Sequence, residues 1–133
     1  MSSPSSGWEA WVAKAEHDLL AIENNIVAEL VPWDVVAFLA QQLAEKYLKA
    51  YLILVGEDPP RIHDLPRLLA LCMKSDPTLA ATTDQCVFLS RIGAISRYPD
   101  NPAEPTEEDA RKAVHLAREV REAMRARLPR GSE

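Results

Sequence analysis

Apolar residues recur at steps of three and four along most of this 133-residue chain, and prolines interrupt the pattern at intervals. Steps of three and four place side chains on one face of an α-helix, whereas a strand alternates apolar and polar residues. No segment shows that alternation between turn residues. The pattern therefore predicts an all-α protein.

Two long amphipathic segments begin the predicted fold. The first carries an apolar stripe over residues 8–30 and ends before Pro32, because a proline disfavours helix at the residue preceding it. The second, over 33–55, is apolar around most of its circumference, so we expect it to be central. Gly56 follows it as the expected helix-terminating residue.

Three further helices are expected. The first is short and begins after Asp64, with Pro66 in its first turn, where proline is tolerated. The next covers about 78–96 and is rich in small residues, which allow a neighbouring helix to approach closely; the segment 97–105 after it is expected to be non-helical. The last begins at Thr106, with acidic residues in its first turn and arginines near its end. Short connections between such helices favour an antiparallel up-and-down bundle of four to five helices.

Charge and composition argue against several classes of protein. The chain has 15 basic and 20 acidic residues, whereas a protein that coats duplex nucleic acid is normally basic. Cys72 and Cys86 lack the spacing of a zinc site and lie in apolar segments, so we expect inert buried thiols. We expect no metal and no cofactor, because no ligand pattern or glycine-rich phosphate loop is present. Without a signal-peptide pattern or a membrane-length apolar run, a cytoplasmic protein is expected.

Three motifs, taken in order, resemble the HEPN domain, a nucleotide-binding domain of higher eukaryotes and prokaryotes. They are Phe38-Leu-Ala-Gln-Gln-Leu-Ala-Glu-Lys-Tyr-Leu-Lys-Ala-Tyr-Leu52, His63-Asp64-Leu65 and Ser96-Arg97-Tyr98-Pro99-Asp100. The resemblance implies a four- to five-helix antiparallel bundle that usually forms a homodimer. We accordingly expect one helical domain over residues 8–128, between disordered tails at 1–7 and 129–133.

Many members of this family look like metal-independent ribonucleases, in which four to six residues separate an arginine from a following histidine. This chain departs from that pattern. Arg91 and Arg97 have no histidine at the required spacing, and Arg111 precedes His115 by only three intervening residues. Such a mechanism needs a cation on the phosphate and an imidazole for proton transfer. The chain instead resembles the Arg-Tyr-Pro-Asp branch, which is associated with nucleotide or polyanion binding and is often encoded beside a minimal nucleotidyltransferase, in a toxin–antitoxin-like arrangement.

The second helix supplies the first group of candidate ligand-binding residues. Its narrow polar strip consists of Gln41, Gln42, Glu45, Lys46 and Lys49. In one interpretation, Lys46 and Lys49 face a phosphate and Gln42 contacts a base or sugar. In the other, the strip is a solvated face or a salt-bridged rim.

Two later segments supply the other candidates. Near a predicted helix start, Arg61 and the free amides could hold an anion, or His63 and the following aspartate could satisfy those amides. Further on, Arg97 could hold a phosphate while Tyr98 stacks on a base. Alternatively, Asp100 could pair with Arg97 and fix the turn.

Three functions fit these residues. The first is a non-catalytic module that binds a nucleotide or short RNA, forms a homodimer and works with a separate minimal nucleotidyltransferase. The second is a divergent ribonuclease in which folding brings His63 to Arg97. The third is a purely structural protein that dimerises through its apolar helices.

Overall fold

A computed structural model describes residues 7–97 and 104–129, and within these ranges every regular element is a helix. The prediction of an all-α fold is therefore confirmed. The elements are α1 (Trp8–Ile26), α2 (Trp33–Leu54), α3 (Leu65–Met73), the 3₁₀ helix η2 (Pro77–Thr82), α4 (Thr83–Arg97) and α5 (Glu107–Arg125).

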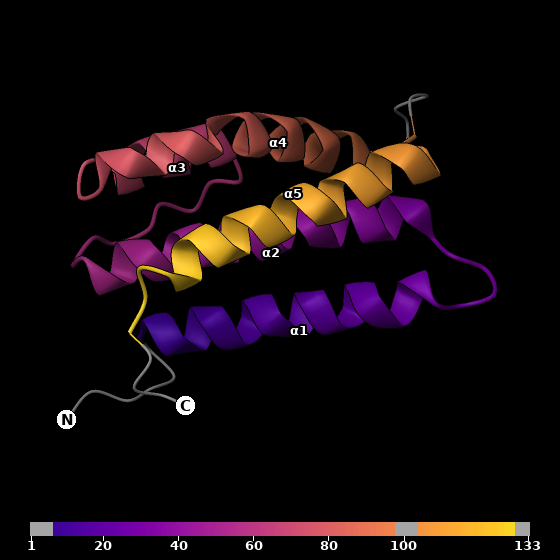
Figure 1. The fold of residues 1–133 in the computed structure, drawn as a ribbon, viewed down its shortest axis with the longest axis horizontal. Helices are drawn as coiled ribbons and strands as arrows, with labels where there is room; N and C mark the ends of the chain where they lie inside the picture. The colour runs from indigo at the N-terminus through magenta and orange to yellow at the C-terminus, as the bar shows by residue number, and fades with distance from the viewer. Residues whose placement is uncertain (1–6, 98–103, 130–133) are drawn as a thin grey trace.

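Helix α2 occupies the middle of the bundle (Figure 1). It packs against α1, α3, α4 and α5, so the prediction that this apolar helix is central is confirmed. In Figure 1 the chain reverses direction between α1 and α2, and again between α4 and α5. Helices α3 and α4 lie together on the side of α2 opposite to α1. None of the helices in the described parts of the chain has the length and apolar character needed to cross a membrane.

The apolar stripes of the other helices pack around α2 and form the core. A helix brings the residues of each stripe onto one face, so the helical conformation allows all of them to be buried. Large side chains such as Leu43 and Tyr47 are fully buried. The same helix also buries three polar side chains, Gln41, Glu45 and Lys49. Buried polar groups need partners within the protein, and those partners define the candidate site below.

The end of α2 and the start of α5 form as their sequences predict. After α2, Gly56 adopts a φ of 86°, which suits glycine, and its N–H donates to the carbonyl of Ile53 at 3.0 Å. The next amide, of Glu57, donates to the carbonyl of Leu52 at 2.8 Å, which completes a Schellman motif. Helix α5 begins with a capping box formed by Thr106 and Asp109.

Three expectations about helix boundaries are corrected. Helix α1 ends at Ile26, and Leu30 lies beyond it, 88% exposed, because the paired asparagines before Ile26 favour turns over helix. The fourth helix does not start at residue 78, since Pro77 and the Asp76 cap hold residues 77–82 in a 3₁₀ turn. It also extends to Arg97, which we expected to be non-helical; proline restricts only the residue directly before it.

Candidate ligand-binding site

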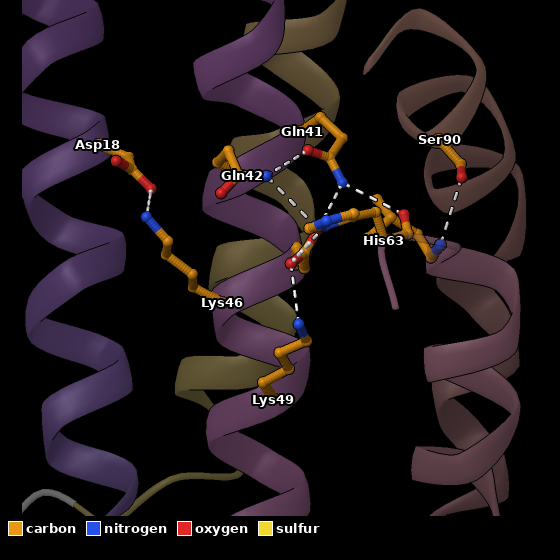
Figure 2. Close-up of polar contacts among 9 residues, drawn as sticks. Asp18, Gln41, Gln42, Lys46, Lys49, His63 and Ser90 are labelled. Atoms are coloured by element: carbon orange, nitrogen blue, oxygen red, sulfur yellow. Dashed lines mark hydrogen bonds and ion pairs between the residues drawn. The ribbon is translucent and has the colours of Figure 1, made fainter. Parts of the chain in front are cut away.

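A ladder of buried polar side chains runs along α2. Gln41, Glu45 and Lys49 are spaced four residues apart, so they lie on one face of the helix. The Nε2 of Gln41 donates to Oε1 of Glu45 at 2.8 Å, and the Nζ of Lys49 donates to Oε2 of Glu45 at 2.9 Å (Figure 2). The Glu45 side chain is 4% exposed and that of Lys49 is 8% exposed. An ion pair at this depth persists only when further hydrogen bonds satisfy its remaining atoms.

His63 joins this ladder from the connection between α2 and α3. Its Nδ1 lies 2.9 Å from Oε1 and 3.1 Å from Oε2 of Glu45. Its backbone carbonyl accepts a hydrogen bond from Nε2 of Gln41 at 3.3 Å (Figure 2). The imidazole is nevertheless 55% exposed. Among the described residues, none makes a hydrogen bond to its other nitrogen, Nε2, which leaves that atom available to a ligand.

The protonation state of Glu45 fixes the role of this histidine. Burial raises the pKa of Glu45, but hydrogen bonds from Gln41, Lys49 and His63 outweigh burial and hold the pKa below its usual value. The ionised carboxylate requires a proton on Nδ1 of His63, because the contact is otherwise repulsive. The exposed Nε2 is then an acceptor in the neutral ring and a donor in the charged ring. Nε2 therefore accepts a hydrogen bond when the ring is neutral and donates one to an anion when the ring is charged.

The start of α3 holds His63 in this position. Asp64 caps the helix, accepting from the amide of Arg67 at 3.2 Å. The amide of the next residue, Leu65, donates to Oγ of Ser90 on α4 at 3.3 Å (Figure 2). The buried Leu65 side chain adds an apolar anchor. The backbone that carries the imidazole is therefore fixed between two helices.

A glycine on α4 allows that helix to approach the ladder. A Cβ atom on Gly93 would lie 2.5 Å from Cγ and 2.9 Å from Cβ of Gln41. Only a residue without a side chain fits there. Helices α4 and α2 therefore approach closely at Gly93, as the small residues of this segment predict. This approach keeps the amide of Gln41 within reach of Glu45 and His63.

The two lysines predicted to face a phosphate are ion-paired inside the protein. The Nζ of Lys46 lies 2.6 Å from Oδ2 of Asp18 on α1 (Figure 2). Lys49 pairs with Glu45 and also lies over the ring of Trp11, with 5.5 Å from Nζ to the centroid. The salt-bridged alternative is therefore the one the structure shows, although Lys49 lies in the interior and not on a solvated rim.

Gln42, the third candidate on this strip, points its amide along the ladder. Its Nε2 donates to Oε1 of Gln41 at 2.8 Å. The side chain is half-buried, so it supports Gln41 and still reaches the surface beside the site.

Free amides at the start of α3 do not provide the predicted anion site. Leu65 and Arg67 donate to the side chains described above, Leu68 donates to the carbonyl of Asp64 at 3.1 Å, and Pro66 has no N–H. Arg61 is exposed, two residues before His63, and no carboxylate among the described residues pairs with it. The Arg61 guanidinium is therefore available to contact an anionic ligand.

The Arg-Tyr-Pro-Asp motif lies at the edge of what the structure describes. Arg97 is the last residue of α4, one turn beyond Gly93. The Arg97 side chain, Tyr98 and Asp100 lie outside the described residues. Phosphate binding by Arg97, stacking by Tyr98 and an Arg97–Asp100 pair remain predictions.

Gln41 and Glu45 organise the site, although neither is among the residues predicted to contact a ligand. The missed signal was their spacing: Gln41, Glu45 and Lys49 recur every four residues in a helix that is apolar around most of its circumference. Polar residues at that spacing in a central helix indicate an internal network. Within residues 7–97 and 104–129, including this site, no group of three or more His, Cys, Asp or Glu side chains is placed to hold a metal ion.

Comparison with known proteins gives one match. The family model of the HEPN domain matches residues 8–127, a range that contains all the helices and the His63 site. No curated protein and no solved structure matches the chain.

Proposed function

Because this chain belongs to the HEPN-domain family, we propose that it binds a nucleotide or a short polyanion at the exposed edge of His63, without cleaving it. The proposal depends mainly on one arrangement: the buried Glu45 carboxylate holds Nδ1 of His63, and Nε2 is directed away from it. An imidazole oriented in this way offers a ligand phosphate a fixed hydrogen-bonding partner.

The charges around His63 favour an anion. Glu45 is already balanced by Lys49, so the pair carries no net charge toward the ligand. A proton on the imidazole would therefore make the site positive, and the exposed Arg61 would add a second cation. In this proposal Arg97 contributes a further guanidinium and Tyr98 a stacking surface.

A non-catalytic role is supported by the sequence. Neither Arg91 nor Arg97 is followed by a histidine with four to six residues in between, and only three residues separate Arg111 from His115. We therefore place the chain in the Arg-Tyr-Pro-Asp branch, acting as a homodimer with a separately encoded minimal nucleotidyltransferase. Co-purification with that enzyme, encoded in an adjacent reading frame, is expected. Failure to bind either the enzyme or any nucleotide would leave only the structural role.

Ribonuclease activity is the second candidate, and the Glu45–His63 contact is the observation that favours it. A carboxylate that orients an imidazole is also the arrangement of a general base. Arg97 would have to supply the cation for the phosphate. This function predicts cleavage of RNA in the presence of EDTA that disappears in His63→Ala, and an intact RNA substrate would exclude it.

Calorimetric titration with ATP, GTP and a short RNA tests the binding function. At least one ligand should bind the wild type, and His63→Ala should weaken that binding about tenfold or more, as expected for loss of a charge-assisted contact. His115→Ala is the matched control, because His115 also contacts a glutamate, Glu119 at 3.5 Å, but both side chains are exposed. Equal binding by the two variants would contradict a site at His63.

A further inference from the structure

Three arginines on α5, and Arg127 just after it, are paired with carboxylates. The ion pairs are Arg111–Glu107, Arg118–Glu23, Arg121–Glu16 and Arg127–Asp76. Arg91 on α4 and Lys112 on α5 differ from them. Both are exposed, and no carboxylate among the described residues lies within ion-pair distance of either.

These two cations meet at one aromatic ring. The Cζ atom of Arg91 lies 5.5 Å from the centroid of Phe88, and Nζ of Lys112 lies 4.6 Å from it. The two distances limit the separation of the charges to about 10 Å, which is close to the Debye length in 0.1 M salt. Their potentials therefore add, and Phe88, Arg91 and Lys112 form what we call the α4–α5 basic patch.

The patch is adjacent to the His63 site across α4. Ser90 contacts the backbone of Leu65, two residues after His63. Arg91 follows Ser90, so it lies about 100° further round the same helix, on its exposed side. Phe88 lies further round α4 in the same direction, and Lys112 of α5 contacts its ring. A chain of anions crossing the outer face of α4 would meet His63, then Arg91, then Lys112.

We propose that the α4–α5 basic patch holds the sugar-phosphate backbone of a single-stranded RNA whose end occupies the His63 site. This inference rests on the proposed function and specifies its ligand as an oligonucleotide. An oligonucleotide carries phosphates along its whole length, so it can place one at His63 and others on the outer side of α4, whereas a single nucleotide carries its phosphates at one end only. The Phe88 ring is already covered by two cations, so the patch offers charge without a free stacking surface. Recognition there is therefore independent of base sequence.

The test compares ATP with an unstructured ten-nucleotide RNA. The ligands are titrated into the wild type, the double variant Arg91→Gln/Lys112→Gln, and the control Lys14→Gln/Lys74→Gln, which removes two exposed cations elsewhere. The patch variant should bind the RNA about tenfold more weakly, and its salt dependence should fall by about 1.4 in log–log slope, since each phosphate contact contributes about 0.7. Its affinity for ATP should be unchanged, and the control should match the wild type.

Several results would overturn the inference. Undiminished RNA binding by the patch variant, or an equal loss in the control, would show that these two cations do not form a site. Oligoglutamate that binds the patch as tightly as RNA would indicate an acidic protein partner. A wild type that binds ATP no more weakly than RNA would overturn the inference alone, whereas a wild type that binds neither would overturn the proposed function as well.

Discussion

Nδ1 of His63 lies 2.9 Å from Oε1 of Glu45, and the two side chains differ sharply in exposure: the carboxylate is 4% exposed and the imidazole 55%. The histidine therefore connects the interior of the bundle to its surface. Through Glu45, its orientation depends on Gln41 and Lys49, both of which are buried on α2. Changes inside α2 should consequently alter binding at the surface.

Removing the charge of Glu45 should destabilise the protein. Glu45→Gln leaves the buried ammonium of Lys49 without its counterion, and loss of one partner of a buried pair destabilises by about 3 kcal/mol. Denaturant unfolding measures the change. The double variant Glu45→Gln/Lys49→Met should recover part of the loss, because it also removes the stranded charge. A double variant less stable than Glu45→Gln would contradict this account.

Acid should destabilise the protein through two carboxylates with lowered pKa values. A hydrogen bond from Arg121 lowers the pKa of Glu16, and hydrogen bonds within the ladder lower that of Glu45 despite burial. Their contributions are fully present above the usual value of 4.5 and are lost as the pH falls through the lower values of the folded state. The free energy of unfolding, measured from pH 7 to pH 2, should therefore decline below about pH 4.5.

Glu16→Gln should flatten that decline, whereas Glu29→Gln, at an exposed position between α1 and α2, should leave it unchanged. If Glu16→Gln and the wild type lost stability in parallel, the Arg121 contact would not be the source of the acid sensitivity.

Gly93→Ala should perturb both stability and ligand binding. The new methyl group would overlap Cγ of Gln41, and overpacking of this kind costs about 1–3 kcal/mol. Gly56→Ala is the matched control, because its strain comes from a φ of 86° with nothing within 4 Å and costs about 1–2 kcal/mol. Calorimetry should show weaker nucleotide binding for Gly93→Ala alone. Equal affinities in the two variants would argue against a role for Gln41.

Both thiols should be unreactive in the folded protein. Burial raises the pKa of Cys72 to about 12 and that of Cys86 to about 11, and only the thiolate is nucleophilic. At pH 8, an aromatic disulfide reagent should label neither cysteine until denaturant is added. Rapid labelling of the native protein would show that α3 or α4 opens readily.

Sequence periodicity was sufficient to predict the helices because each buried stripe is a local pattern of one helix. Gly56 and Thr106 likewise act through neighbouring residues, so the C-terminal end of α2 and the start of α5 are predictable. The 3₁₀ turn after Pro77 was missed, since i→i+3 and i→i+4 hydrogen bonding suit nearly the same residues.

The site was less predictable because its contacts join distant parts of the chain. His63 is a candidate from the sequence alone, but its partner Glu45 lies 18 residues earlier, on α2. The pairing of Lys46 with Asp18 spans 28 residues, and nothing local distinguishes it from a free lysine. Whether Lys46 is neutralised depends on how α1 packs against α2, which the sequence near Lys46 does not determine.

The central claim is that His63 keeps Nδ1 on Glu45 and offers Nε2 to a ligand phosphate. Imidazole ¹⁵N NMR of the wild-type protein, recorded while ATP or a short RNA is added, tests it most directly. We predict that the Nε2 resonance of His63 shifts and saturates with added ligand, while Nδ1 keeps the signature of a protonated nitrogen. An unmoved Nε2 resonance at ligand saturation, or a free Nδ1, would contradict the account.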